Sequence, residues 1–334
     1  MPLPNLPLLD TFGRRHNNLR ISVTDRCNIR CFYCMPADTI KFLPRTAILS
    51  FEEIERVVAA LAQVGVDKLR LTGGEPLVRT DIDRLVQMLK AIPQIREVAM
   101  TTNAVHLARY AEPLKRAGLD RLNISLDALT RETFVAITRR DVLDQVLAGI
   151  AAAQDAGFQR IRLNAVAIKG LTEAEVLPLA RFALERNLDL RFIEFMPLDS
   201  DQAWSNEQVL SGQTIRELIE QEFGPLEEAP RTDPAQPAFD FRYAAGRGRL
   251  GLIHPVTAPF CDTCNRLRLT AEGKLRNCLF SLEEWDLREP LRRGASEAEI
   301  LTLVRECVLA KQPGHLIGQQ HFERPERTMH QIGG

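Results

Sequence analysis

Residues 19–34 read LRISVTDRCNIRCFYC, in which a short strand candidate runs directly into a loop with Cys27, Cys31 and Cys34. A structural zinc ion takes four ligands in a tetrahedron, so three thiolates alone do not close such a site. On a cubic iron–sulfur cluster, three thiolates leave one iron without a protein ligand. An open iron is useful only where another molecule binds it. This first triplet therefore predicts a cluster that carries a small molecule.

A second triplet lies near the other end of the chain, where Cys261, Cys264 and Cys278 repeat the open arrangement. Disulfides are disfavoured because the cysteine fraction is low for a stapled scaffold, and because no basic segment followed by an apolar run marks a secretory signal. A zinc site that draws on both triplets stays open as an alternative. Taken together, the two triplets favour two clusters.

The composition is that of a globular protein with balanced charge, with 43 Lys and Arg against 44 Asp and Glu. This balance argues against nucleic acid as a partner bound through bulk charge, and no apolar run is long enough to span a membrane. Cysteines kept reduced for metal imply a cytosolic (cytoplasmic) location. The seventh cysteine, Cys307, shares a helix face with Ile300 and Val304 and is predicted to lie in the core.

Short apolar strands alternate with amphipathic helices through the first two-thirds of the chain, which predicts an α/β fold with a parallel sheet. The strand candidates are 19–24, 68–72, 97–101, 121–125, 160–168 and 189–194. Six units are too few for a closed eight-stranded barrel, so we expect a partial (open) parallel βα barrel of about six units.

We place this partial barrel at residues 1–215 and a smaller C-terminal region, which carries the second cluster, at residues 216–334. The second region has short strand candidates at 239–243 and 250–253 and a helix candidate at 297–309. Within the first region, two helix starts match the capping-box pattern, Ser50 with Glu53 and Thr172 with Glu175.

Conspicuous residues follow the expected strands, at the carboxyl ends where parallel α/β folds gather function. Besides the first triplet they include Gly73-Gly74-Glu75-Pro76, Thr101, Ser125 and Met196. The glycines would let main-chain groups approach a ligand closely, although a purely structural turn is the competing interpretation. We therefore expect an iron–sulfur loop, a glycine turn and several hydroxyls to face one mouth of the barrel.

Two arginines follow the second triplet at a spacing of two, Arg266 and Arg268. Side chains two apart share a face in an extended segment, and paired guanidiniums bind polyphosphates well. The alternative is a charged strand that faces solvent. The position of both arginines beside a cysteine triplet favours the polyphosphate site over this alternative. Arg20 and Arg70, taken alone, are ordinary charged strand residues.

Three regions together resemble one family. The first triplet with Tyr33 is similar to the signature of the radical S-adenosylmethionine (SAM) superfamily. The surrounding stretch 19–28, the stretches 261–270 and 275–280, and the tail 327–334 resemble the GTP 3′,8-cyclase branch of that superfamily. The resemblance extends from about Phe12 to Gly334.

The resemblance implies that the first triplet holds a [4Fe–4S] cluster whose free iron chelates SAM. An electron from a one-electron donor would then cleave SAM and release a 5′-deoxyadenosyl radical. That radical would take hydrogen from C3′ of GTP. The C3′ radical would attack C8 and close a ring, and reduction of the cyclised radical would yield 3′,8-cyclo-7,8-dihydro-GTP, the first step of molybdenum cofactor biosynthesis. The second triplet would hold another [4Fe–4S] cluster that binds the guanine. A downstream partner, cyclic pyranopterin monophosphate synthase, would use the product.

The resemblance also assigns residue roles. The implied SAM contacts are Tyr33, Gly74, Ser125 and Met196. The implied GTP contacts are Arg20, Arg70, Thr101, Arg162, Arg266 and Arg268. Arg162 stands where the family commonly has a lysine, and a planar fork is not equivalent to a point charge. Gly333 and Gly334 are implied to enter the active site as catalytic residues.

Two other functions remain to be weighed. Another radical SAM enzyme with an auxiliary cluster would explain both triplets but not the arginines beside the second. A non-catalytic module that holds zinc or transfers electrons would explain the cysteines alone, and iron content and colour distinguish it. The oligomeric state stays open, a homodimer included.

Overall fold

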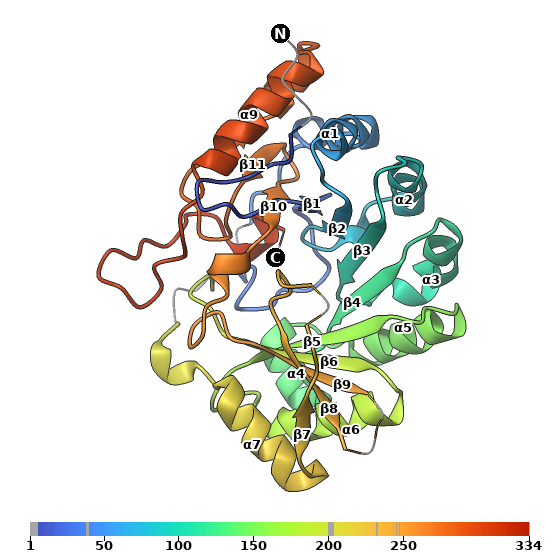
Figure 1. The fold of residues 1–334 in the computed structure, drawn as a ribbon. Coiled ribbons are helices and arrows are strands. Elements are labelled where there is room, and N and C mark those ends of the chain that lie inside the picture. The colour runs from blue at the N-terminus through green and yellow to red at the C-terminus, as the bar shows by residue number, and fades with distance from the viewer. Residues whose placement is uncertain are drawn as a thin grey trace.

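The computed structural model describes residues 6–37, 40–199, 204–231, 233–244, 246 and 248–333. Within these ranges the strands form one continuous sheet in the order β12-β11-β10-β1-β2-β3-β4-β5-β6-β9-β8-β7. The sheet curves into an open barrel, with helices covering its outer face (Figure 1). The partial parallel barrel expected from the sequence is confirmed.

The six predicted units form the centre of the sheet, and their strands are all parallel. They are β1 (Asn18–Ser22), β2 (Lys68–Thr72), β3 (Glu97–Thr102), β4 (Arg121–Ser125), β5 (Ile161–Ala167) and β6 (Asp189–Glu194). The helices that connect them are α1 (Phe51–Gln63), α2 (Ile82–Lys90), α3 (Leu107–Arg116), α4 (Arg131–Thr138), α5 (Leu143–Asp155) and α6 (Val176–Glu185).

The hydrophobic core lies between the sheet and these outer helices. Alternate strand residues such as Leu19 and Ile21 are fully buried, and so is the helix stripe that includes Ile54 and Val58. Successive side chains of a strand point to opposite faces, so the residues between these apolar positions face the barrel interior. The strand pattern thus fixes which side chains reach the site.

The first capping box is confirmed, because Ser50 accepts from the Glu53 amide and Glu53 accepts from the Ser50 amide. The second is wrong. The Thr172 hydroxyl instead accepts from the Ile168 amide four residues earlier, and Glu175 accepts from the Leu129 amide in the loop that follows β4. The sequence pattern does not reveal that these partners replace the cap, and α6 begins only at Val176.

The C-terminal region extends both edges of the sheet. From α7 (Gly212–Phe223) the chain forms β7 (Leu226–Glu228), β8 (Phe239–Tyr243) and β9 (Arg249–Ile253), and β9 pairs in parallel with β6. It then crosses to the opposite edge, where β10 (Arg266–Leu269) pairs in parallel with β1 and is followed by β11 (Lys274–Arg276) and β12 (Trp285–Asp286). The division at residue 215 stays a prediction and falls within α7.

The last described residues lie against the inner face of the sheet, where the Gly333 carbonyl accepts from Arg268. After α8 (Arg288–Arg292) and α9 (Glu297–Leu309), a tail returns to the sheet and forms a 3₁₀ helix at Met329–Gln331. Arg327 anchors this tail through ion pairs with Glu272 and Glu284. Cys307 is fully buried in α9, as predicted. In the described ranges, no helix has both the length and the apolar character needed to cross a membrane.

Candidate functional site

One row of arginines is built by strand register. Arg20 in β1 pairs with Arg70 in β2 on one side and with Arg268 in β10 on the other. Paired residues of parallel strands point to the same face about 4.8 Å apart, so three guanidiniums lie side by side on the barrel interior. Like charges at this spacing repel one another, which makes the row a favourable place for a polyanion.

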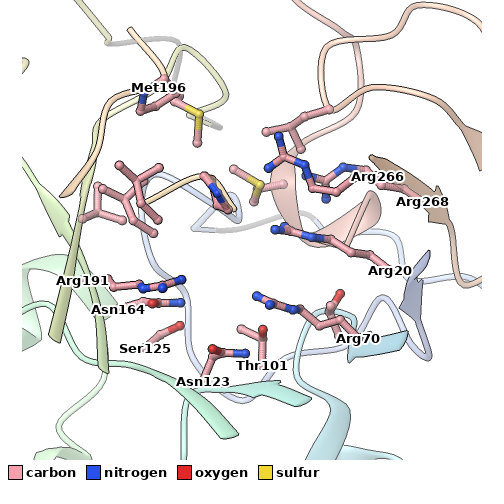
Figure 2. A pocket seen from close by; sticks show the side chains of 18 of the residues that line it. Arg20, Arg70, Thr101, Asn123, Ser125, Asn164, Arg191, Met196, Arg266 and Arg268 are labelled. Atoms are coloured by element: carbon pink, nitrogen blue, oxygen red, sulfur yellow. The ribbon is translucent and has the colours of Figure 1, made fainter. Parts of the chain in front are cut away.

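A second, more polar row faces the first. The register aligns Ser125 in β4 with Asn164 in β5, and Asn164 with Arg191 in β6. Figure 2 shows Arg191, Asn164 and Ser125 reaching into the cavity from one side, while Arg20 and Arg70 reach in from the other. The two rows therefore face each other across a common space.

That space is a single cavity of about 530 Å³. It is lined by every candidate residue except the two tail glycines: Arg20, Cys27, Cys31, Tyr33, Cys34, Arg70, Gly74, Thr101, Ser125, Arg162, Met196, Cys261, Cys264, Arg266, Arg268 and Cys278. The β1 loop and the C-terminal region thus bring both triplets to the same cavity, although more than 200 residues separate them in the sequence.

Electrostatics mark the cavity as a site for an anion. Burial and the neighbouring Arg266 lower the pKa of Arg268 to about 9. Burial, then repulsion from Arg20, likewise lowers the pKa of Arg70 well below its usual value. Such shifts mean that the cationic forms lack compensating negative charge. A bound polyphosphate would supply that charge.

Around the first triplet the neighbouring charges are carboxylates. Burial, then the nearby Glu75, raises the pKa of Cys27 to about 11, and burial followed by Asp127 raises that of Cys31 well above its ordinary value. Tyr33 donates its hydroxyl to Asp127 over 2.5 Å. Burial raises the pKa of Asp127 to about 6, so the carboxyl group at this end of the cavity is desolvated.

Around the second triplet the neighbouring charges are cations. Arg266 places Nε and Nη2 at 3.3 Å from Cys264 Sγ, and its guanidinium lies over the Phe260 ring. Lys311 Nζ lies 3.6 Å from the same sulfur. Although burial raises the pKa of Cys264, Arg266 and Lys311 outweigh it and lower that pKa to about 6.

The cysteines fit iron–sulfur clusters. All seven are free, and the thiols of each triplet are close enough to influence one another electrostatically. Among the described residues, no group of three or more His, Cys, Asp or Glu side chains is arranged around a point that suits a single metal ion. A pooled zinc site needs that arrangement, whereas a cubic cluster binds each thiolate to a different iron.

The Gly73-Gly74-Glu75 turn is attached to the first cysteine loop. A side chain at Gly74 would lie 2.3 Å from the Arg26 carbonyl oxygen, so only glycine fits. The Glu75 amide donates to that same carbonyl over 2.8 Å. The Glu75 carboxylate then accepts from the Asn103 amide over 2.7 Å, and Asn103 Nδ2 lies 3.7 Å from Cys27 Sγ. The close approach predicted for Gly74 is therefore made at least to protein backbone.

The tail reaches both ends of the cavity. Arg268 Nη1 donates to the Gly333 carbonyl over 2.6 Å. The His330 amide donates to the Cys34 sulfur, and Met329 and His330 line the cavity. Gly333 has φ of +68°, where glycine is favoured. Gly334, the other predicted catalytic glycine, lies outside the described residues.

The sequence reasoning missed several residues of this site. Arg191 shows the same signal as Arg20 and Arg70, a charge at an inward position of a buried strand, and a consistent reading of β6 would have found it. Asp127 ends the conspicuous Ser125-Leu126-Asp127 stretch after the fourth strand, but its bond with Tyr33 depends on a residue 94 positions away. Arg14, His330 and Lys311 have no local signal, because their roles depend on contacts with residues more than 40 positions away.

Two families match consecutive parts of the chain. The family described as Radical SAM superfamily matches residues 21–183, which span β1 to α6. The family described as Molybdenum Cofactor Synthesis C matches residues 188–317, which span β6 to α9. The second match contains the whole second triplet and its arginines.

Curated relatives match nearly the full chain. A protein named GTP 3′,8-cyclase from Rhodopirellula baltica is 51% identical over 332 residues, which cover 98% of this chain and 92% of the relative. Proteins of the same name from Paenarthrobacter nicotinovorans and Pelotomaculum thermopropionicum are each 44% identical, covering 98% and 97% of this chain and 97% and 99% of the relatives.

A solved structure supports the fold alone. The structure titled Streptococcus suis SuiB bound to S-adenosylmethionine superposes with a TM-score of 0.61 at 15% identity. The match covers 85% of this chain and 65% of that one.

Proposed function

This chain belongs to the GTP 3′,8-cyclase family of the radical SAM superfamily, and we propose that the cavity lined by both triplets holds SAM and GTP between two clusters. It is accordingly an enzyme of molybdenum cofactor biosynthesis that uses SAM and [4Fe–4S] clusters to cyclise GTP. The observation that supports the arrangement is that both triplets and the arginine row line one cavity.

We assign the first triplet to the cluster that binds SAM. When bound, that cluster and SAM supply a carbon-centred radical. The surrounding protein then encloses SAM and provides the electrostatic environment that favours its binding. Tyr33, which donates to Asp127, lines the cavity together with Ser125 and Met196. The acidic, desolvated surroundings favour a ligand that carries positive charge, as the ammonium and sulfonium groups of SAM do.

We assign the arginine row to the triphosphate of GTP. Arg20, Arg70 and Arg268 lie in register and present guanidinium forks that suit phosphate oxygens. Thr101 Oγ1 is buried and has no hydrogen-bond partner among the described residues, so it offers a hydroxyl to the ligand. Arg162 stands on β5, two strands beyond Thr101 in β3, and contributes a further cation to the cavity.

We propose that the three cysteines of the second triplet ligate the cluster that binds guanine. Its open iron would face the same cavity as the arginine row, so base and triphosphate would be held by different elements of one region. Two-point binding of this kind restricts the orientation of a substrate and gives the proximity on which radical transfer depends. The tail glycines would complete the enclosure beside Arg268.

The experiment is anaerobic incubation of the reconstituted protein with SAM, dithionite and GTP. We expect equal amounts of 5′-deoxyadenosine and a cyclised guanine nucleotide, both measured by mass spectrometry. The matched control replaces GTP with ATP, which keeps the triphosphate and changes the base. SAM cleavage without any cyclised nucleotide would contradict the proposed substrate.

Three further partners remain proposals: a one-electron donor, cyclic pyranopterin monophosphate synthase and a second copy of this chain. We also propose a cytosolic location, because the thiols of both triplets are free.

A further inference from the structure

Lys311 lies immediately after α9 and is almost fully buried, with 4% of its surface exposed. Its ammonium group donates to the carbonyl oxygens of Arg266, at 3.2 Å, and of Asn277. Its third contact is Cys264 Sγ at 3.6 Å. All three donors of the ammonium group are therefore directed at the segments that carry the second triplet.

The charge of Lys311 requires a counter-charge. A buried ammonium is costly unless an anion pairs with it. Among the described residues, no carboxylate lies within ion-pair distance of Lys311 Nζ, and the sulfur of Cys264 is the group in contact that ionises to an anion. Lys311 shares this sulfur with Arg266, and both cations contact an anion there when Cys264 is the thiolate that ligates iron.

The contacts of Lys311 also reach the other ligands. Asn277 precedes Cys278, so holding the Asn277 carbonyl fixes the peptide that leads into the third ligand. Arg14 fixes the chain just after Lys311 by donating to the carbonyls of Gln312 and Pro313. The same Arg14 guanidinium donates to the Cys261 carbonyl over 2.9 Å. Lys311 thus occupies the centre of a network that touches all three cysteine segments.

We propose that Lys311 is a positioning residue of the second cluster, whose ammonium holds the Cys264 thiolate by a charge-assisted hydrogen bond and raises the reduction potential of that cluster. The proposal rests on the function assigned to the second triplet above. A cation beside a ligating sulfur stabilises the more negative, reduced state of a cluster, so hydrogen bonds and charges at the sulfurs tune its potential.

The test isolates the second cluster in a full-length parent in which Cys27, Cys31 and Cys34 are all changed to Ala. In this parent, Lys311→Gln removes the charge and keeps an amide donor, whereas Lys311→Arg keeps the charge. The control is Lys274→Gln, which removes the same charge from β11, where Lys274 pairs with Asp286. The measurements are iron per chain and the midpoint potential from a redox titration followed by electron paramagnetic resonance (EPR).

We expect the midpoint potential to fall in Lys311→Gln and to stay close to that of the parent in Lys311→Arg and Lys274→Gln. A Lys311→Gln protein with the parent's iron content and potential would overturn the proposal. A parent without iron would overturn the assignment of the second cluster together with this proposal. The two failures are distinguishable because they occur in different proteins.

A second measurement does not depend on the folding of Lys311→Gln. The parent, labelled with ¹⁵N-lysine and reduced, is examined by pulsed EPR for a nitrogen coupling to the cluster spin. We expect a ¹⁵N coupling in the parent that disappears in Lys311→Arg grown with the same label. A parent without this coupling, or one whose coupling persists in Lys311→Arg, would overturn the contact on which the proposal depends.

Discussion

The two cysteine triplets line the same cavity, yet their surroundings carry opposite charge. The first triplet lies beside Glu75 and Asp127, and burial together with these carboxyl groups raises the pKa of its thiols. The second lies beside Arg266 and Lys311, which lower the pKa of Cys264. Identical ligand sets in one cavity therefore provide two chemically different ends.

This difference matches the two proposed ligands. SAM carries an ammonium and a sulfonium group and is favoured where the protein is acidic, whereas the triphosphate of GTP is favoured among arginines. A substrate bound at the wrong end would place like charges together, which is unfavourable in a desolvated site. The charge difference thus sets the order of the ligands along the cavity, and the following experiments test it.

The largest expected effect is at the first triplet. Cys31→Ala removes one ligand of the cluster that binds SAM, so reductive SAM cleavage should be abolished. The second cluster should remain, and iron should fall from about eight to about four per chain. The control is Cys307→Ala, which changes a buried cysteine that lies in the core. Undiminished 5′-deoxyadenosine formation by Cys31→Ala would show that this triplet does not hold the catalytic cluster.

The tail connects the two ends, and its removal should affect turnover more than binding. Deleting Gly333 and Gly334 removes the carbonyl that accepts from Arg268 without removing apolar packing. Lost positioning of this kind costs about a hundredfold in rate. We expect product per chain to fall by that order while GTP affinity and iron content stay near those of the full chain. Full product yield from the shortened chain would mean that the tail is an ordinary terminus.

Much of this architecture was predictable from the sequence. The bounds of β2, β4, β6, β8 and α9 agree with the expected ranges residue for residue. Their alternating or helical apolar patterns are local, and each strand or helix buries the face that its pattern indicates. The gathering of candidate site residues at the strand ends was also predictable, because parallel strands bring their carboxyl ends to one edge of the sheet.

Other parts were beyond local patterns. The addition of β9 and β10 to opposite edges of the sheet depends on a chain crossing that no spacing encodes. The register of Arg268 with Arg20 follows from that crossing, so the arginine row could not be derived from β1 and β10 separately. Thr172 and Glu175 matched a capping pattern but bond elsewhere, because Glu175 finds a tertiary partner in the Leu129 amide and the Thr172 hydroxyl accepts from the Ile168 amide.

The arginine row should determine GTP affinity. Arg268→Ala removes a charge-assisted contact from the cationic end of the cavity, and such contacts contribute about 1.5–3 kcal/mol. We expect GTP to bind about 10–150-fold more weakly, as measured by equilibrium dialysis without SAM. Arg266→Ala should weaken GTP binding on the same scale. Arg293→Ala, which changes an exposed arginine paired with Glu299, serves as the control.

If neither Arg266→Ala nor Arg268→Ala alters GTP affinity, these residues are a charged strand and not a phosphate site. A complication is specific to Arg266, because its guanidinium contacts the sulfur of Cys264. Iron content must therefore be measured beside affinity for that variant. Arg268 makes no such contact among the described residues, so it gives the cleaner result.

The charge difference also predicts cysteine reactivity in the metal-free protein. The pKa of Cys264 is lowered to about 6 and that of Cys27 is raised to about 11, while both residues are partly exposed. Thiolates are the reactive form, so iodoacetamide at pH 7 should label Cys264 faster than Cys27, by about tenfold or more. Because the pKa of Cys264 is depressed, its labelling should decline as pH falls through about 6. Equal rates, found by peptide mass spectrometry, would contradict the charge difference.

The smallest expected effect concerns Arg162, where the family resemblance noted in the sequence leads us to expect a lysine. Its Nε lies 3.4 Å from Asp189 Oδ2, and its side chain lines the cavity on the strand next to Asn123. Arg162→Lys keeps the charge and loses the planar fork, so it tests whether geometry or charge matters at this position. We expect GTP affinity to change by less than about 1 kcal/mol, the scale of one ordinary hydrogen bond.

Arg162→Ala, which loses both charge and fork, should weaken binding more. If Arg162→Lys weakens binding as much as Arg162→Ala does, the guanidinium makes a forked contact with GTP that a point charge cannot replace, and the cationic end extends across the barrel to β5.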